Sequence, residues 1–250
     1  MDLRERNVSH NKRHPWETVR ANFFASKITS LIGNTAVSVL DLGSGDCWFA
    51  EQLLPKLPNR SQITCCDINF TDADIAASNG KSILRTREIP AQQFDLIIML
   101  DVIEHIEHET NFLHENVHPH LKPNGTILIS VPAHPSLFTT HDTFLGHYRR
   151  YTRKHLLHVA NSSFTTFDSG YLFISLAVAR WLQSLQRNKK QISENGVGAW
   201  SAGPLVTALV TSLLYIDAAI SRVFQKFNLR VSGLTVWTIC RSQASTQESV

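Results

Sequence analysis

Short apolar segments alternate with segments of helical periodicity from residue 36 to residue 131. The segment at 94–100, FDLIIML, is apolar almost throughout, which is typical of a strand buried on both faces of a parallel sheet. Regular alternation of strand and helix predicts a doubly wound α/β domain. We expect its strands at 36–42, 62–66, 81–84, 94–100 and 126–131, with helices between them at 48–57, 72–78 and 101–121.

The remainder of the chain is less regular but carries further elements. The spacing of apolar residues predicts a helix at 16–32. No internal repeat is visible, so the remaining elements are expected to complete the same sheet. After the alternating region we expect helices at 152–161, 172–185 and 205–227 and strands at 164–171 and 234–240.

The composition narrows the classes of protein to consider. Hydrophobic residues make up 43% of the 250 residues, so the chain can bury a sizeable core and is not expected to be disordered. Lys and Arg number 24 against 21 Asp and Glu, and a net charge of +3 is too balanced to predict a nucleic-acid partner. The four cysteines form no Cys-x-x-Cys pair, so we expect buried, reduced thiols and a cytoplasmic protein.

The turn after the first expected strand contains two glycines, Gly43 and Gly45. Glycines at this position of an α/β domain let a ligand approach the backbone closely. The dinucleotide pattern G-x-G-x-x-G fails because Trp48 stands where its third glycine belongs, and the P-loop pattern is absent. Asp41, two residues before Gly43, would repel a pyrophosphate but suits a ligand that carries a cationic group.

A second acid, Asp67, ends the second expected strand. A carboxylate at that position can accept hydrogen bonds from both hydroxyls of a ribose. A nucleoside with positive charge and no phosphates satisfies both acids. S-adenosylmethionine is such a ligand, because it combines an ammonium, a sulfonium and a ribose.

Four blocks of the sequence resemble, in their order and spacing, the motifs of the class I S-adenosylmethionine-dependent methyltransferases. They are VLDLGSGD at 39–46, CCDIN at 65–69, FDLIIMLDVIEHI at 94–106 and LKPNGTILISVP at 121–132. The resemblance implies a Rossmann-like α/β fold, with a seven-stranded, mostly parallel sheet of order 3-2-1-4-5-7-6 and helices on both faces. Its last strand would be antiparallel, and 234–240 is the candidate for it.

The resemblance also implies S-adenosyl-L-methionine as the cofactor and a division of the single domain. Residues 1–33 would form an N-terminal lid helix, 36–132 the cofactor-binding core, and 133–233 a substrate-binding and capping section with a helical substrate cap. The expected cofactor contacts are Asp41, Gly43, Ser44 and Gly45 at the methionine end, Asp67 at the ribose, Ile68 beside the adenine, and Asp101 and Val102 under the sulfonium.

The residues Asp101, Glu104 and His105 follow the fourth expected strand in the pattern acid-x-x-Glu-His. In ubiquinone-type O-methyltransferases a similar block holds a divalent metal, whereas many family members carry the Glu-His pair without a metal. There the acid stands at a helix start, where the helix dipole favours it. We expect no metal and keep these three residues as the alternative metal site.

Imidazole, phenol and guanidinium groups gather on the loop after the fifth expected strand, where α/β proteins bind ligands. His141 and His147 are the candidate general bases, because an imidazole has a pKa near neutrality. The run GHYRRYT at 146–152 resembles a block in bacterial small-molecule and lipid-pathway methyltransferases of this class. The expected substrate-binding residues are His14, Trp16, His105, His134, Arg149, Arg150 and Tyr151, with ion pairs to neighbouring helices as the alternative for the two arginines.

Two segments outside the motifs have two interpretations each. The segment 14–17, HPWE, is similar to the N-terminal lids of these enzymes, but a proline is equally typical of an ordinary helix start. The apolar segment 204–220 is shorter than the about 20 residues of a membrane-spanning helix. We expect the helix at 204–227 to pack on the sheet and form a substrate wall, with a peripheral membrane or dimer contact as the alternative.

The sequence thus predicts a methyltransferase that uses S-adenosyl-L-methionine and acts by direct in-line transfer. Its substrate would be a small-molecule or carrier-bound aromatic or lipophilic intermediate. Two alternatives stay open: a metal-dependent quinone-type O-methyltransferase, and a non-catalytic, cofactor-binding partner subunit. No nucleic-acid partner is expected, and the expected location is the cytoplasm, with membrane association as the alternative.

Overall fold

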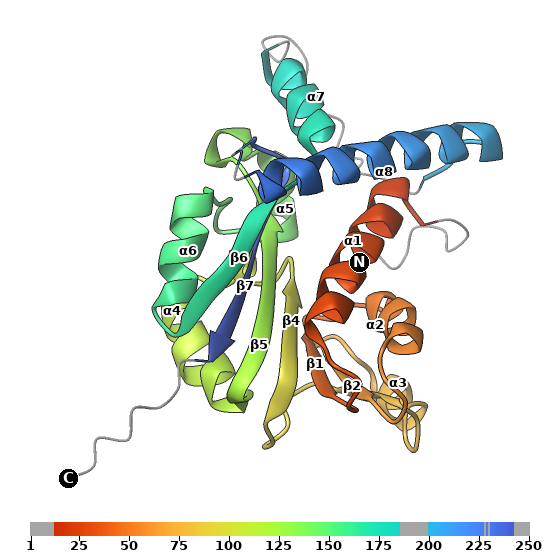
Figure 1. Cartoon of the computed structure of the whole chain (residues 1–250), viewed down its shortest axis with the longest axis vertical. Coiled ribbons are helices and arrows are strands. Elements are labelled where there is room, and N and C mark those ends of the chain that lie inside the picture. Colours follow the sequence, from red (N-terminus) through yellow and green to blue (C-terminus); the bar gives the residue numbers. More distant parts are fainter. Residues whose placement is uncertain (1–12, 186–199, 228, 230, 243–250) are drawn as a thin grey trace.

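The computed structural model describes residues 13–185, 200–227, 229 and 231–242. The beginning of the predicted lid segment and part of the predicted capping section, at 186–199, lie outside the described residues. Figure 1 shows one twisted sheet with helices on both faces, and two helices, α7 and α8, beyond one end of the sheet.

The sheet has seven strands in the order β3-β2-β1-β4-β5-β7-β6. Pairs among β1 to β5 are parallel, and β7 runs antiparallel between β5 and β6. This topology confirms the predicted fold. The strands are β1 (Ser38–Leu42), β2 (Gln62–Cys66), β3 (Ile83–Thr86), β4 (Phe94–Leu100), β5 (Leu121–Pro132), β6 (Phe164–Leu172) and β7 (Thr235–Ser242).

Local signals in the sequence set several helix starts. The ring nitrogen Nδ1 of His14 accepts from the backbone N–H of Trp16 at the start of α1, and Thr152 caps α6 through the N–H of His155 at 3.1 Å. The helices are α1 (Pro15–Leu31), α2 (Trp48–Leu53), α3 (Asp72–Ala76), α4 (Glu109–Phe112), α5 (Thr140–Leu145), α6 (Arg153–Asn161), α7 (Ile174–Leu185) and α8 (Pro204–Lys226).

The segment predicted as one helix at 101–121 is broken into short turns. Asp101 has a left-handed φ of 58°, a 3-10 turn covers Ile103–His105, and α4 continues into a π-helical turn at Leu113–Val117. Pro119 has no backbone N–H and cannot continue an α-helix. The prediction of a continuous helix here is therefore wrong, and the irregular backbone lies next to the end of β4.

Strand β5 begins earlier than predicted, at Leu121 rather than at residue 126. Leu121 pairs with Phe94 and Thr126 with Leu96, so the residues between them bulge out of the register. Asn124 in this bulge has a φ of 61°. The residues Pro123, Asn124 and Gly125 are thus built into the strand as a bulge.

Two apolar cores lie on the two faces of the sheet. The core under α1, α2 and α8 contains Phe23 and Phe24, whose rings meet the ring of Trp237 on β7 at centroid distances of 5.8 and 6.4 Å. The core on the other face contains Tyr151 and Phe164, both fully buried. The first helix and the last strand therefore share one core.

Helix α8 packs on α1 through its inner face only. Leu214 and Ala218 are buried there, and the Asn22 amide on α1 donates to the Tyr215 hydroxyl at 2.6 Å. The large apolar residues on its outer face are exposed. The inner face of α8 thus packs mainly on α1 and also meets β6 of the sheet, and the predicted substrate wall stays a prediction. In the part of the chain that the structure describes, α8 alone has the length and hydropathy of a membrane-crossing helix, a property that core helices of soluble proteins also have.

Candidate active site

The carboxyl ends of β1, β2 and β4 meet at one edge of the sheet, and the glycine turn after β1 lies there. The backbone N–H of Gly43 donates to the carbonyl of Cys66, at the end of β2, at 2.8 Å. Gly43 and Gly45 have φ values of 69° and 55°, in the left-handed region that glycine favours. A Cβ added to Gly43 would lie 2.6 Å from Cγ2 of Val102. The turn, here called the glycine cradle (residues 43–46), therefore requires glycine at its first position.

Asp67 at the end of β2 is fixed against the cradle. Its Oδ2 accepts from the backbone N–H of Gly45 at 2.9 Å, and its Oδ1 accepts from the backbone and side-chain amides of Asn69 at 3.0 Å each. Ile68 next to it is 76% exposed. The structure thus brings the residues predicted for ribose and adenine to the rim of the cradle, where those contacts stay predictions.

Asp41 at the end of β1 is buried without a hydrogen bond to its Oδ2 from any described residue. Burial raises the pKa of Asp41 to about 8, and the neighbouring thiol of Cys47 adds to the shift. The hydroxyl of Ser44 in the cradle is buried and equally without a partner among the described residues. Orphaned buried polar groups are costly. A ligand with an ammonium group would satisfy the carboxylate, so this end of the cradle fits an amino-acid cofactor.

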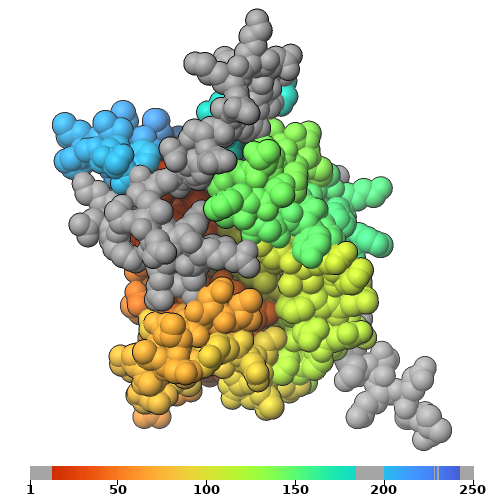
Figure 2. Space-filling view, turned by 180° about the vertical axis from the view of Figure 1, so that it is seen from behind, coloured from red at the N-terminus to blue at the C-terminus, as the bar shows by residue number. Residues whose placement is uncertain are grey.

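The first helix is attached to the cradle at its N-terminal end. Arg13 forms an ion pair with Asp46 of the cradle, and its guanidinium lies 4.8 Å from the ring centre of Trp48. Figure 2 shows red atoms of this N-terminal part beside the green segment that follows β5. The helix predicted as a lid therefore borders the site.

A second ion pair attaches α1 to the end of β4. Arg20 pairs with Asp101, and its guanidinium lies 4.6 Å from the ring centre of Trp16. The ring of His14 meets the ring of Trp200, just before α8, edge-on at 4.7 Å, and burial lowers the pKa of His14. Asp101, predicted as a cofactor contact, thus has a protein partner, and His14 and Trp16 lie on the segment that borders the site, where their contact with a substrate stays a prediction.

The predicted substrate loop is organised around one buried carboxylate, Asp142. It accepts from Nε of Arg150 at 2.7 Å, from the backbone N–H of Thr139 at 2.9 Å, and lies 3.0 Å from Nδ1 of His147. Burial opposes ionisation of Asp142, but the His147 and Arg150 contacts outweigh it and hold its pKa well below the usual range. His147 and Arg150 are therefore fixed in orientation by one acid.

Arg149 and Tyr151 also have protein partners. Arg149 forms an ion pair with Glu109 at the start of α4, and the Tyr151 hydroxyl donates to the carbonyl of Ile103 at 3.1 Å. Tyr151 is fully buried. Both arginines of the loop thus show the ion-pair alternative of the sequence interpretation, and their contact with a substrate stays a prediction.

His134 lies at the end of β5, whereas His141 lies beside the buried carboxylate cluster, where the charges of Asp142 and Arg150 act on it. His134 has a φ of 66°, and its Nε2 lies 3.0 Å from the carbonyl oxygen of Gly233, before β7. His141 on α5 stacks on Phe144 at 6.4 Å, and burial lowers its pKa. His134 therefore connects the ends of β5 and β7, whereas His141 stays a candidate base on a short helix.

Three side chains at the end of β4 have the composition of a metal site. One ligand atom each of Glu104, His105 and His147 lies within 4.8 Å of the others. Both carboxylate oxygens of Glu104 are buried without a hydrogen bond from the described residues, and burial, together with the Asp101 charge, raises its pKa well above its usual value. The alternative metal site predicted from the sequence consists of Asp101, Glu104 and His105. In the structure His147, rather than Asp101, lies beside Glu104 and His105.

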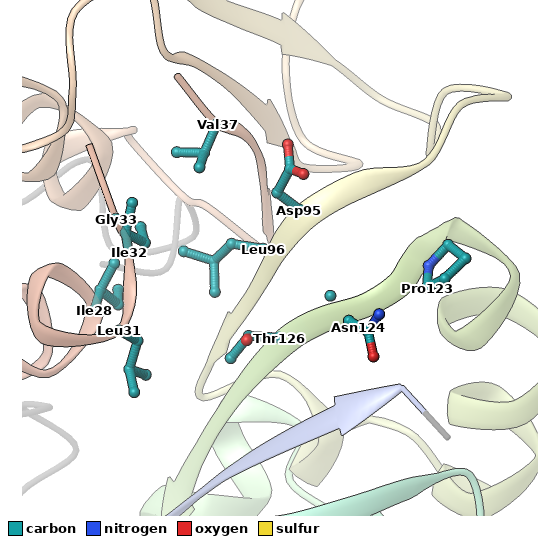
Figure 3. Close-up of a pocket in the computed structure, with 11 residues that line it drawn as sticks. Ile28, Leu31, Ile32, Gly33, Val37, Asp95, Leu96, Pro123, Asn124 and Thr126 are labelled. Carbon is teal, nitrogen blue, oxygen red and sulfur yellow. The ribbon is translucent and has the colours of Figure 1, made fainter. Parts of the chain in front are cut away.

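A separate pocket lies at the opposite end of the sheet, between the end of α1 and the starts of β4 and β5 (Figure 3). Its one carboxylate, Asp95, accepts from the Ser38 backbone and hydroxyl at 2.8 and 2.7 Å and from Lys122 at 2.9 Å. Burial opposes ionisation, yet these donors hold the pKa of Asp95 below its usual value. The carboxylate of this pocket is thus already bound by donors of the protein itself, and the pocket lies at the edge of the sheet away from the cradle.

The sequence did not predict the roles of Arg13, just before α1, of Arg20, on α1, or of Asp142 at the centre of the loop cluster. Arg20 lies within the helix predicted at 16–32, whereas Arg13 lies before it. The spacing of Trp16 and Arg20, four residues apart, is a signal that both point to one side of the helix. Their acidic partners lie on distant segments and carry no signal in the local sequence.

The seven-stranded sheet with its antiparallel last strand and the cradle between Asp41 and Asp67 define a class I S-adenosylmethionine-dependent methyltransferase. A family model described as a methyltransferase domain matches residues 10–187, so the chain belongs to that methyltransferase family. The cofactor of this class is S-adenosyl-L-methionine, and the orphaned carboxyl of Asp41 and the glycine cradle fit it.

Named relatives support the same assignment. Over 124 residues the chain is 30% identical to the ubiquinone biosynthesis O-methyltransferase of Rickettsia felis, a match that covers 47% of this chain and 50% of the relative. The chain thus spans about half the length of the curated relatives that it matches.

Solved structures share the fold at low identity. The N-methyltransferase NodS from Bradyrhizobium japonicum, in complex with S-adenosyl-L-homocysteine, is 14% identical with a TM-score of 0.52, and the match covers 95% of each chain. A coclaurine N-methyltransferase is also 14% identical, with a TM-score of 0.54 over 94% of this chain and 75% of the other. At these identities the likeness concerns the fold.

Proposed function

We propose that this chain transfers the methyl group of S-adenosylmethionine to an oxygen of a small lipophilic or aromatic acceptor. The observation that carries methyl transfer is the glycine cradle, with the buried Asp41 at one side and Asp67 at the other. The O-methyltransferases of ubiquinone biosynthesis among the relatives support an oxygen acceptor. The exposed apolar surface of α8, next to α1, supports a lipophilic one.

The residues of the cradle would bind and orient the cofactor. The cofactor, when bound, supplies a methyl group on a sulfonium, which needs no further activation. Asp41 would accept the ammonium of the methionine part and Asp67 the ribose hydroxyls. Arg13 and Arg20 would hold α1 over the site and exclude water, so that the acceptor is aligned in a dry pocket.

His147 is the favoured general base for an acceptor hydroxyl, which must lose a proton. Its Nδ1 is held by Asp142, so its Nε2 is oriented away from that carboxylate. A carboxylate that fixes an imidazole in this way also stabilises the imidazolium after proton uptake. His141 is the alternative base, because burial lowers its pKa and so favours the neutral imidazole that can accept a proton.

A second candidate function is metal-assisted O-methylation, favoured by the orphaned Glu104 beside His105 and His147. One carboxylate and two imidazoles suit several divalent transition metals. The Asp142 contact to His147 resembles the outer carboxylate that commonly orients a metal-binding histidine. A metal held there would lower the pKa of a bound acceptor hydroxyl, and His147 would then act as a ligand rather than as a base.

The test is transfer of a labelled methyl group. The protein is incubated with methyl-labelled cofactor and either a lipophilic catechol, a matched anisole without free hydroxyls, or an aromatic amine, and products are identified by mass spectrometry. The proposal expects label on the catechol oxygen only. Label on the amine would overturn the oxygen acceptor.

A scaffold role makes a different prediction in the same experiment. Cofactor binding detected by calorimetry, with no label transferred to the acceptors or to any fraction of a cell extract, would contradict the proposed enzyme and favour a non-catalytic partner subunit. An Asp67→Asn variant serves as the control for specific binding, because it removes the charge that would accept the ribose hydroxyls.

A further inference from the structure

Helix α8 carries a continuous row of large apolar side chains on its outer face. Each of them is between 43 and 67% exposed, and Leu205 at the start of the helix is 85% exposed. In Figures 1 and 2 the helix extends beyond the body of the molecule. We call this row the apolar stripe: Val206, Leu209, Leu213, Ile216, Ile220, Val223 and Phe227.

The inner face of α8 fixes the direction of the stripe. The buried carboxylate of Asp217 accepts from the backbone N–H groups of Ile174 and Ser175 at 3.0 and 2.8 Å, and so holds the start of α7. Leu214 and Ala218 are buried in the core that α1 shares. The helix therefore cannot turn its stripe inward or leave the body to cross a bilayer without exposing these contacts.

The charged side chains of α7 and α8 that are not buried are all basic among the described residues. Among the described residues from Ile174 to Lys226, Asp217 is the only acid, and it is 5% exposed. The cations are Arg180, Arg222 and Lys226. An apolar face with basic residues at its border complements an anionic lipid surface.

The exposed apolar residues are not confined to α8. On α7, Val178, Trp181 and Leu182 are between 49 and 55% exposed. Tryptophan is favoured at the boundary between lipid and water. The alternating three- and four-residue spacing of the stripe is also that of a seam between paired helices, but such a seam is usually flanked by charged residues. Here, in contrast, the described part of α8 before Arg222 has no exposed charge.

We propose that α8, together with α7, docks on the surface of an anionic lipid bilayer. The stripe would lie among the lipid chains and headgroups, and the inner face would keep its contacts to α1. Because α1 also borders the cofactor cradle, docking would place the site entrance near the lipid. This docking does not depend on the acceptor proposed above, since it requires neither cofactor nor substrate.

The test is flotation of the full chain with vesicles of phosphatidylcholine alone or mixed with phosphatidylglycerol. We expect binding that is stronger with phosphatidylglycerol and that weakens at about 1 M salt, where the Debye length falls from about 8 to about 3 Å. The variant with Leu209→Gln and Ile216→Gln should partition on the order of a hundredfold more weakly, because each large apolar side chain kept out of lipid costs about tenfold.

A matched control is Leu31→Gln, at the far end of α1, where Leu31 is 39% exposed. It should bind vesicles like the wild type. Unchanged thermal unfolding and cofactor affinity in the double variant would show that it is folded and that the cradle is intact, whether or not methyl transfer is found.

Two results would overturn the proposal. One is equal vesicle binding by the wild type and the double variant. The other is a wild-type dimer in sedimentation velocity that does not float with vesicles and that the double variant converts to monomer, which would assign the stripe to a second copy of the chain.

Discussion

The guanidinium of Arg20 and the carboxylate of Asp101 form an ion pair across 81 residues of sequence. Arg20 belongs to the first helix, whereas Asp101 ends the strand next to the glycine cradle. The pair therefore joins the first helix to the edge of the sheet that carries the glycine cradle.

Replacing Arg20 by glutamine should weaken cofactor binding. The pair is partly exposed, so its loss is expected to cost about 1–2 kcal/mol, or about 5- to 30-fold in the dissociation constant measured by calorimetry. The control is Lys27→Gln, on the same helix as Arg20. It breaks the 2.8 Å ion pair between Lys27 and Asp168 of β6, away from the cradle. An equal loss in both variants would mean that α1 acts only as a structural helix.

The pKa of Asp41 predicts how the stability of the cofactor-free protein depends on pH. Its folded pKa of about 8 lies above the unfolded value of about 3.9, so the folded state keeps a proton that the unfolded state loses between these values. The free energy of unfolding should therefore fall as pH rises from about 4 to 8, by up to about 1.4 kcal/mol per pH unit. In Asp41→Asn this contribution disappears, so urea unfolding of the variant and the wild type should diverge with increasing pH. Parallel curves would contradict the prediction.

The same carboxyl predicts proton release on cofactor binding. Below pH 8 the cofactor-free Asp41 is largely protonated, and an ammonium beside it favours the ionised form. Calorimetry at pH 7 in buffers of different ionisation enthalpy should show release of a proton by the wild type. Asp41→Asn should bind more weakly and release none through this group. Equal release by both proteins would assign the proton to another residue.

Arg150→Met tests the buried cluster around Asp142. The variant leaves a buried carboxylate without its guanidinium partner, which is expected to cost about 3–5 kcal/mol in the free energy of unfolding. The neighbouring Arg149→Met breaks the more exposed pair with Glu109 and should cost about 1 kcal/mol. If Arg150→Met unfolds like the wild type and only raises KM for the acceptor, Arg150 serves the substrate rather than the fold.

Metal dependence distinguishes the two candidate functions. If Glu104, His105 and His147 hold a metal, Glu104→Gln should reduce Mn²⁺ binding by at least about tenfold, as measured by electron paramagnetic resonance, because a carboxylate ligand is lost. Activity should fall with EDTA and return on addition of metal. Activity that EDTA leaves unchanged would remove the metal site and leave His147 as the base.

The cradle could be predicted from sequence because its determinants are local. Gly43 and Gly45 stand in a turn that requires left-handed backbone, and Asp41 and Asp67 end two adjacent parallel strands. The bounds of β2 and β4 also agree with the prediction, since each is a compact apolar run closed by a polar residue. These features could be predicted because the residues that determine them lie within a few positions of one another in the sequence.

Other parts of the site depend on contacts between distant segments. Nothing near His134 in the sequence indicates that its ring meets the carbonyl of Gly233, and nothing near Asp101 indicates Arg20. The helix predicted at 101–121 failed for a similar reason. Its apolar spacing is helical, but Pro119 cannot continue a helix. Leu121 pairs with Phe94 instead and so belongs to β5.

The position of β7 between β5 and β6 has a consequence for synthesis on the ribosome. Strand β6 joins the sheet only through β7, and the rings of Phe23 and Phe24 on α1 need Trp237 of β7 to complete their core. At the usual rate of about 5–20 residues per second, translation from the end of β5 to β7 takes on the order of ten seconds. During that interval the edge of β5 is unpaired and α1 lacks part of its packing surface. Helix α1, which borders the glycine cradle, is therefore fixed in place only after β7 has emerged, so α1 and β7 reach their final packing together.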